Sequence, residues 1–215
     1  MTSLITLGRR QAVALVGAGV LALVAACGGG GGSDATAPGA TPSSFSSGVI
    51  SGFGSVIVNG VRWDDSSASV TDDDGNRKSR SDLKLGMTVE VDGGPVNKSA
   101  ATGVAMAIRY GAETLGPVTS VDTAASTLVV LGQTVEVTAS TVFGESITGG
   151  LAGIAAGAVV EVHGLYDAAA AKVVATRIEV KTGVTEYRLR GTLGALDTTA
   201  KTFQIGSETI SYASA

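Results

Sequence analysis

The chain has 215 residues, of which 31 are glycine and only 4% are aromatic, and its formal net charge is −4. Two basic residues and no acidic one lie in residues 1–26, so residues 27–215 carry a net charge of −6. A negative domain repels phosphate backbones, which excludes nucleic acid as an expected partner. The abundance of glycine, alanine, valine and threonine favours short strands and tight turns over long helices.

The first 26 residues have the pattern of an export signal. The pair Arg9 and Arg10 precedes an apolar stretch from Gln11 to Ala26 that carries no charge. A positive region followed by a short apolar region is typical of a secretory signal peptide. The stretch is shorter than the ~20 residues of a membrane span. The residues flanking the arginines fit a twin-arginine signal poorly, so we expect the general secretory route.

The apolar stretch ends in a sequence that resembles a bacterial lipobox. Val24 and two small residues precede Cys27, the single cysteine of the chain. The resemblance implies cleavage between Ala26 and Cys27, a thioether to diacylglycerol on the sulfur, and acylation (palmitate or a similar chain) of the new amino group. Several acyl chains on one residue anchor a protein stably. The alternative is an ordinary signal peptide with a stray cysteine near its cleavage site.

Residues 27–47 are expected to form the lipidated cysteine and a disordered linker. Five consecutive glycines, Gly28 to Gly32, are followed by prolines and serines. Such a segment cannot bury enough apolar surface to offset its chain entropy. Twenty residues of this kind have a root-mean-square reach of roughly 25 Å, enough to hold a domain clear of lipid headgroups.

From Gly48 onward the sequence repeats itself. Three pairs of segments align: 85–93 with 156–164, 104–108 with 174–178, and 116–128 with 191–203. The period of about 70 residues is longer than that of solenoids and propeller blades, and it indicates separate small domains. The predicted units are 48–111, 115–181 and a truncated third unit, 187–215, which suggests that the chain is a fragment.

Within each unit the apolar residues alternate with a period of two, as in half-buried strands. The predicted elements, in chain order, are a capped short helix at 81–86, a strand at 104–110, a hairpin at 128–137 with its turn at Gly132-Gln133, and strands at 160–162 and 174–181. Three strands, a short helix or loop and two strands match a five- to six-stranded OB-like barrel, which leaves no long unpaired edge. The expected fold class is therefore all-β, with tandem small barrels after a signal peptide and a linker.

The repeated pattern resembles a known group of proteins. Val-Glu-Val-x-Gly at Val89 and at Val160 is its sharpest element, with an aspartate and a threonine five residues apart in the second and third units. These features resemble tandem β-barrel repeats of bacterial lipoproteins, which are catalogued only as a domain of unknown function. The first unit departs from the pattern, because its first turn, 52–55, is shorter and lacks the aspartate and threonine. The resemblance implies no catalytic residues.

Three residues are of a type that could take part in acid–base catalysis. His163 is the only histidine, but its aligned position in the first unit is Asp92, and a solvent-facing residue at a strand end explains both. Glu90 and Glu161 recur once per unit, on what we expect to be the outer face. A paired-carboxylate site needs both acids in one cleft, and one acid in each of two separate domains argues against such a site.

Two further groups of residues, an acidic run and a pair of aromatic side chains, each have a structural and a functional interpretation. Asp72-Asp73-Asp74 lacks the alternating oxygen ligands of a calcium loop, so a solvated turn is expected and no metal site. Trp63 and Phe53 would suit a stacking platform for sugars, although Trp63 fits a core position better.

We therefore predict a lipid-anchored binding or structural module in the periplasm or at the cell surface, not an enzyme and without cofactors. Gly28 after the cysteine favours the outer membrane, because it lacks the aspartate that retains some lipoproteins in the inner membrane. The membrane itself and an envelope protein or glycan are the expected partners. The alternative is an accessory part of an envelope enzyme whose catalytic region lies outside this chain.

Overall fold

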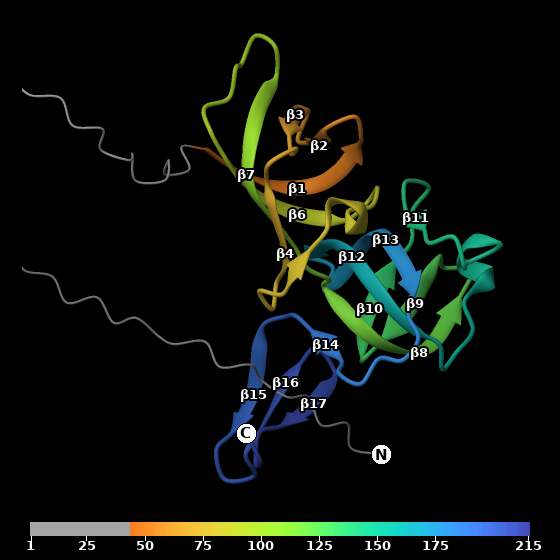
Figure 1. Ribbon diagram of the computed structural model, residues 1–215. Coiled ribbons are helices and arrows are strands. Elements are labelled where there is room, and N and C mark those ends of the chain that lie inside the picture. The colour runs from red at the N-terminus through yellow and green to blue at the C-terminus, as the bar shows by residue number, and fades with distance from the viewer. Residues whose placement is uncertain (1–43) are drawn as a thin grey trace, which may run out of the picture.

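The computed structural model describes residues 44–215, so the predicted signal peptide, Cys27 and nearly all of the linker lie outside the described residues. The described part folds into two closed barrels and a small third sheet, all of them built from β-strands. Figure 1 shows the three parts by colour: one barrel from orange to yellow-green, one from green to blue, and the third sheet in dark blue. The predicted all-β fold with tandem small barrels is confirmed.

The first barrel closes through five strands. They are β1 (Ser44–Gly52), β2 (Val56–Val58), β3 (Val61–Asp64), β6 (Thr88–Gly93) and β7 (Thr102–Tyr110). Neighbouring strands follow the order β1-β2-β3-β7-β6 and return to β1, with β3 and β7 parallel and the other pairs antiparallel. This is the strand order of the OB-type barrel predicted from the sequence. A hairpin of β4 (Ser69–Asp72) and β5 (Arg77–Lys78) extends the sheet beside β7.

The second barrel repeats this topology. Its strands are β8 (Thr114–Asp122), β9 (Thr127–Val130), β10 (Gln133–Glu136), β12 (Val159–Asp167) and β13 (Lys172–Val180), with β10 and β13 parallel. The short β11 (Val142–Phe143) also runs parallel to β13, and a 3-10 turn, η2 (Gly150–Gly153), precedes β12.

The two barrels match down to the residue register. Glu90 lies opposite Arg109 in the first, and Glu161 lies opposite Glu179 in the second. Both β7 and β13 carry a bulge at the same place, at Met106 and at Thr176, which have no opposite residue in β6 and β12. The alignment of the repeats in the sequence therefore corresponds to structural equivalence.

The aspartate that recurs in the second and third units stabilises a turn. The carboxylate of Asp122 accepts hydrogen bonds from the backbone N–H groups of Ala124 and Ala125, both at 2.9 Å. Asp197 accepts the same two bonds in the third sheet. Aspartate commonly stabilises a tight turn in this way. The missing aspartate at 52–55 means that the first unit makes this turn differently.

Two predicted elements differ in detail from the structure. The 3-10 helix η1 (Arg80–Asp82) is capped by Ser79 rather than by Ser81, because the Ser79 and Asp82 side chains each bond the other's backbone N–H. The β9–β10 turn is Leu131-Gly132 rather than Gly132-Gln133. Both turn residues have positive φ, 47° and 69°, as a two-residue hairpin turn requires.

Each barrel has its own core. Buried side chains of the first barrel surround Trp63, which is only 1% exposed. The buried core of the second barrel consists of aliphatic side chains. Phe143 and Tyr187 pack against that core while partly buried. The interiors of both barrels are thus filled with side chains.

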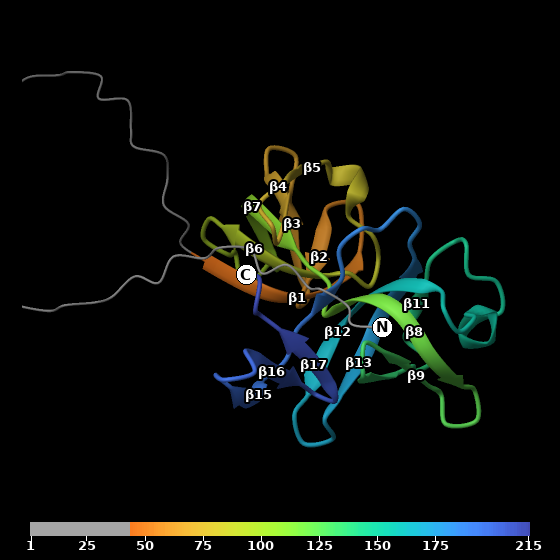
Figure 2. The same ribbon diagram turned by 90° about the horizontal axis from the view of Figure 1, so that it is seen from below.

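The chain beyond the second barrel first adds a strand to the sheet of that barrel and then forms a sheet of its own. β14 (Arg188–Leu189) pairs with β8, so the first residues of the predicted third unit belong to the sheet of the second barrel. β15 (Leu193–Asp197), β16 (Thr202–Ile205) and β17 (Glu208–Ser211) form a separate antiparallel sheet (Figure 2). No helix in residues 44–215 is long and apolar enough to cross a bilayer.

Candidate functional site at the junction of the barrels

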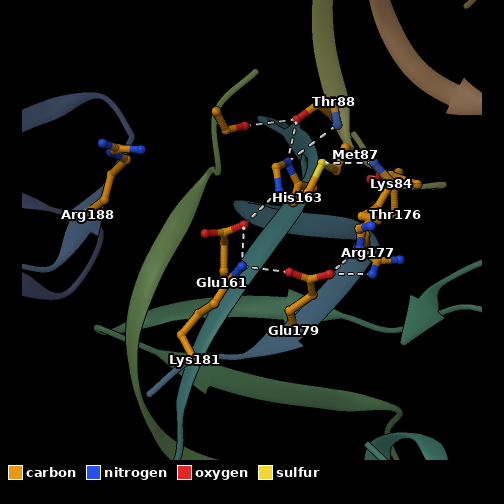
Figure 3. A network of polar contacts seen from close by, with 12 residues as sticks. Lys84, Met87, Thr88, Glu161, His163, Thr176, Arg177, Glu179, Lys181 and Arg188 are labelled. Carbon is orange, nitrogen blue, oxygen red and sulfur yellow. Dashed lines mark hydrogen bonds and ion pairs between the residues drawn. The ribbon is translucent and has the colours of Figure 1, made fainter. Parts of the chain in front are cut away.

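Charged and polar side chains concentrate where the two barrels meet. Only three residues, 111–113, connect β7 with β8, so the barrels are held close together. Residues 85–88 of the first barrel, here called the docking loop, lie against the outer face of β12 and β13 (Figure 3). We call this surface of the second barrel the receiving face. Its side chains are Glu161, His163, Thr176, Arg177 and Glu179.

The docking loop contacts the receiving face through its backbone. The Thr176 hydroxyl donates to the carbonyl of Gly86 at 2.6 Å, and Arg177 Nη1 donates to the carbonyl of Leu85 at 3.0 Å. Gly86 has φ of +85°, and a Cβ atom there would lie 2.6 Å from the carbonyl oxygen of Thr176. Only glycine fits both the conformation and the space.

His163 is buried completely at this contact. Its Nδ1 lies 3.4 Å from the backbone N of Thr88, and its Nε2 lies 3.1 Å from Oε1 of Glu161. If Nδ1 accepts from the Thr88 amide, Nε2 carries the proton and donates to Glu161. The prediction of a solvent-facing histidine is therefore wrong. The side chain does point outward from its barrel, but the other barrel covers that face.

A chain of ion pairs surrounds the histidine (Figure 3). Lys181 Nζ lies 2.6 Å from Glu179 and 3.3 Å from Glu161, and the Arg177 guanidinium pairs with Glu179. Burial alone would raise the pKa values of Glu161 and Glu179. The hydrogen bonds and positive charges of their partners outweigh burial and lower both pKa values. Burial alone would lower the pKa of Lys181, but its two carboxylate partners raise it.

These shifts predict the pH range in which the junction is stable. The pKa values of Glu161 and Glu179 are depressed by folding, so their contribution is present above the ordinary glutamate pKa of about 4.3 and is lost as pH falls further. We expect the free energy of unfolding to fall steeply below that pH. Glu161→Gln should flatten this fall, as measured by denaturant titration across the acid range.

The matched control is Glu90→Gln at the equivalent position of the first barrel. The Glu90 side chain is 47% exposed and pairs with Arg109 at the surface, whereas Glu161 is 18% exposed. Surface pairs contribute little. An acid profile changed equally by both substitutions would contradict this account of the junction.

A second group of ion pairs ties the chain after the second barrel to the first barrel. Arg188 pairs with Asp73 at 2.6 Å and also with Asp74, and Arg190 pairs with Asp73. The Asp72 carboxylate holds the turn by accepting from the backbone of Asp74 and Asn76. The predicted turn is present, but the prediction that it is solvated is wrong for Asp73, whose side chain is 11% exposed because the arginines cover it.

A cavity of about 400 Å³ lies between these two groups of ion pairs. Charged side chains of both barrels line it, together with Met87, Tyr110 and Leu115. Burial, followed by the nearby carboxylates of Asp82 and Glu161, raises the pKa of Tyr110 to about 12. The phenol therefore stays protonated at neutral pH and can only donate or accept hydrogen bonds.

The other candidates from the sequence are not brought into this site. Trp63 fills the core of the first barrel, as the core interpretation predicts, and Phe53 is 51% exposed. The two do not form a shared platform. Glu90 and Glu161 lie in different environments on different barrels. Within residues 44–215, no group of three or more histidine, cysteine or acidic side chains could hold a metal ion. Ala26 and Cys27 lie outside the described residues.

Sequence reasoning missed most of the junction. Arg177 and Lys181 are central to it, and they replace Ala107 and Gly111 of the first unit. A position where a small residue in one repeat becomes charged in the next is the signal that could have identified them. Arg188 and Arg190 offered no such signal, because their partners lie more than 110 residues away in the sequence.

Comparison with known proteins agrees with this architecture. A family described as "Domain of unknown function (DUF5666)" matches the chain twice, at residues 46–102 and 116–179. Each match falls on one barrel. Comparisons with curated proteins and with solved structures gave no match. Because the two matches together cover more than half of the chain, the protein belongs to the DUF5666 family and carries two tandem copies of its domain.

Proposed function

We propose that this protein is a lipid-anchored module outside the cytoplasm that binds a partner or has a structural role, without catalysing a reaction. The burial of His163 and the partners of its ring nitrogens support the absence of catalysis in this proposal. Both of its ring nitrogens face partners within the protein, and the side chain has no exposed surface. A general acid or base must reach the proton that it transfers.

The charged groups around the histidine support the same proposal. Arg177 and Lys181 each pair with Glu179, and the nearest hydroxyl, that of Thr88, donates to the carbonyl of Gly111 at 3.1 Å. Arg177 and Thr88 contact the opposite barrel, and Glu179 and Lys181 are paired within the second barrel. The outer surfaces of a rigid pair of barrels then remain for recognition. Their negative charge favours an envelope protein or a neutral glycan over nucleic acid.

The sequence around Cys27 supports the location. A thioether-linked diacylglycerol with a further acyl chain would hold the module at a membrane. Gly28 after the cysteine favours the outer membrane.

The anchor is tested by Cys27→Ser in the full chain. We expect this variant to leave the membrane fraction and to lose labelling by a clickable palmitate analogue, because oxygen at this position cannot form the thioether. The matched control is Ser33→Ala, a change of similar size within the linker, which should keep both properties. Membrane retention and lipid labelling of Cys27→Ser at the level of the control would refute the proposed anchor.

A further inference from the structure

The second barrel carries its own copy of the docking loop. Residues 156–159 are equivalent to 85–88, and their glycines share a left-handed backbone conformation, with φ of +87° at Gly157 and +85° at Gly86. Each glycine also donates its N–H to the first strand of its own barrel, Gly86 to Ile50 and Gly157 to Val118. The environments differ. Gly86 is buried against the other barrel, whereas Gly157 is exposed and a Cβ atom there would meet nothing within 4 Å.

The first barrel carries its own copy of the receiving face. This equivalent surface on β6 and β7 consists of Glu90, Asp92, Met106, Ala107 and Arg109. In the second barrel the face is covered and Arg177 is buried. In the first barrel Glu90 and Arg109 are exposed, and Ala107 is only half-buried. The neighbouring Phe45 and Val104 are exposed by 63% and 52%. Each chain thus has one occupied loop and face, and one open loop and face.

The two open surfaces also match in chemistry. At the occupied junction a polar face, with Thr176 and Arg177, bonds the carbonyls of the loop. On the open face these positions are Met106 and Ala107, which donate no side-chain hydrogen bond. The open loop also lacks charge, because residues 146–160 contain no charged side chain, and Ala155 and Ala156 are exposed. The exposed Phe45 and Val104 beside the open face offer apolar contacts to this loop.

We propose that a second copy of this chain is the partner: the loop at 156–159 of one copy docks on the β6–β7 face of the next. Such an interface joins two different surfaces, so each added copy again presents an open loop and an open face. Copies would then associate head to tail. This association does not rest on the acylation of Cys27, although tethering at one membrane would raise the local concentration of copies.

The experiment blocks one surface at a time in the full chain and then mixes the variants. Ala107→Glu places a bulky acid on the open face that cannot donate to the carbonyls of the loop, and Ala156→Glu places an acid on the open loop, opposite a face that already carries Glu90 and Asp92. Both positions are at the surface, so each variant is expected to fold, which circular dichroism can verify. We expect the unchanged chain to form dimers and larger species in sedimentation velocity, and each variant alone to be monomeric.

The mixture distinguishes this arrangement from others. Equal amounts of the two variants should form dimers and nothing larger, because only one productive loop–face pair remains. A mixture that stays monomeric, or an unchanged chain that stays monomeric at high concentration, would overturn the proposal. Dimers formed by either variant alone would also overturn it, since they would indicate a symmetric interface. The proposed anchor is tested separately through Cys27, so the two can fail independently.

Discussion

Gly86→Ala is expected to destabilise the docked pair of barrels, whereas Gly157→Ala should leave it docked. Both glycines have a left-handed backbone conformation, so both substitutions carry a conformational cost of about 1 kcal/mol. Only at Gly86 would the added Cβ lie 2.6 Å from the Thr176 carbonyl and 3.1 Å from the Arg177 Cβ. Overpacking of this kind typically costs a further 1–3 kcal/mol or so.

The comparison of the two variants isolates the junction. In dilute solution, denaturant unfolding should show Gly157→Ala with one transition, slightly shifted. Gly86→Ala should show a larger loss and a separation of the two barrels into independent transitions. Equal effects of the two substitutions would mean that the contact of Gly86 with β13 contributes nothing to stability.

Trp63→Ala should have the largest effect within a single barrel. The indole ring lies against the backbone of Gly93 and Gly103, so closely that a Cβ atom at either glycine would come within 2.5 Å and 2.7 Å of the ring. Removing a fully buried tryptophan typically costs about 3–5 kcal/mol. The matched control is Phe53→Ala, since Phe53 is exposed and its loss should change stability by roughly 0.5 kcal/mol or less.

Trp63→Phe adds a finer test of the same site. The indole Nε1 is buried without a hydrogen-bond partner, so phenylalanine removes a costly polar group while keeping an aromatic ring. We therefore expect Trp63→Phe to cost much less than Trp63→Ala in the free energy of unfolding, measured by denaturant titration. If alanine and phenylalanine cost the same, or if the loss at Phe53 matches that at Trp63, the described core is wrong.

The barrels could be predicted from the sequence because repeats constrain each other. The Val-Glu-Val-x-Gly segments at 89–93 and 160–164 fix one strand in each unit, and their alternation indicates which side faces the core. The same alternation explains the error at His163. A period of two separates the inner face of a strand from its outer face. It does not reveal whether water or another domain covers the outer face.

The junction depends on contacts that no local pattern encodes. Asp73 and Arg188 are 115 residues apart, and Thr88 and His163 are 75 residues apart. The sequence of the docking loop is similarly uninformative, because the contacts of Gly86 and Leu85 are made by backbone carbonyls. What the sequence does contain is the contrast between the units, with small residues at Ala107 and Gly111 and charged residues at Arg177 and Lys181.

The claim on which the proposed function depends is that the two barrels form one rigid body. The most direct test is a spin-label distance measurement in the Cys27→Ser chain, with Lys98→Cys in an exposed loop of the first barrel and Ala124→Cys in one of the second. In dilute solution, where the copies are separate, a docked pair predicts a single narrow distance distribution that broadens when Gly86→Ala is added. A broad distribution in the chain that retains Gly86 would contradict it.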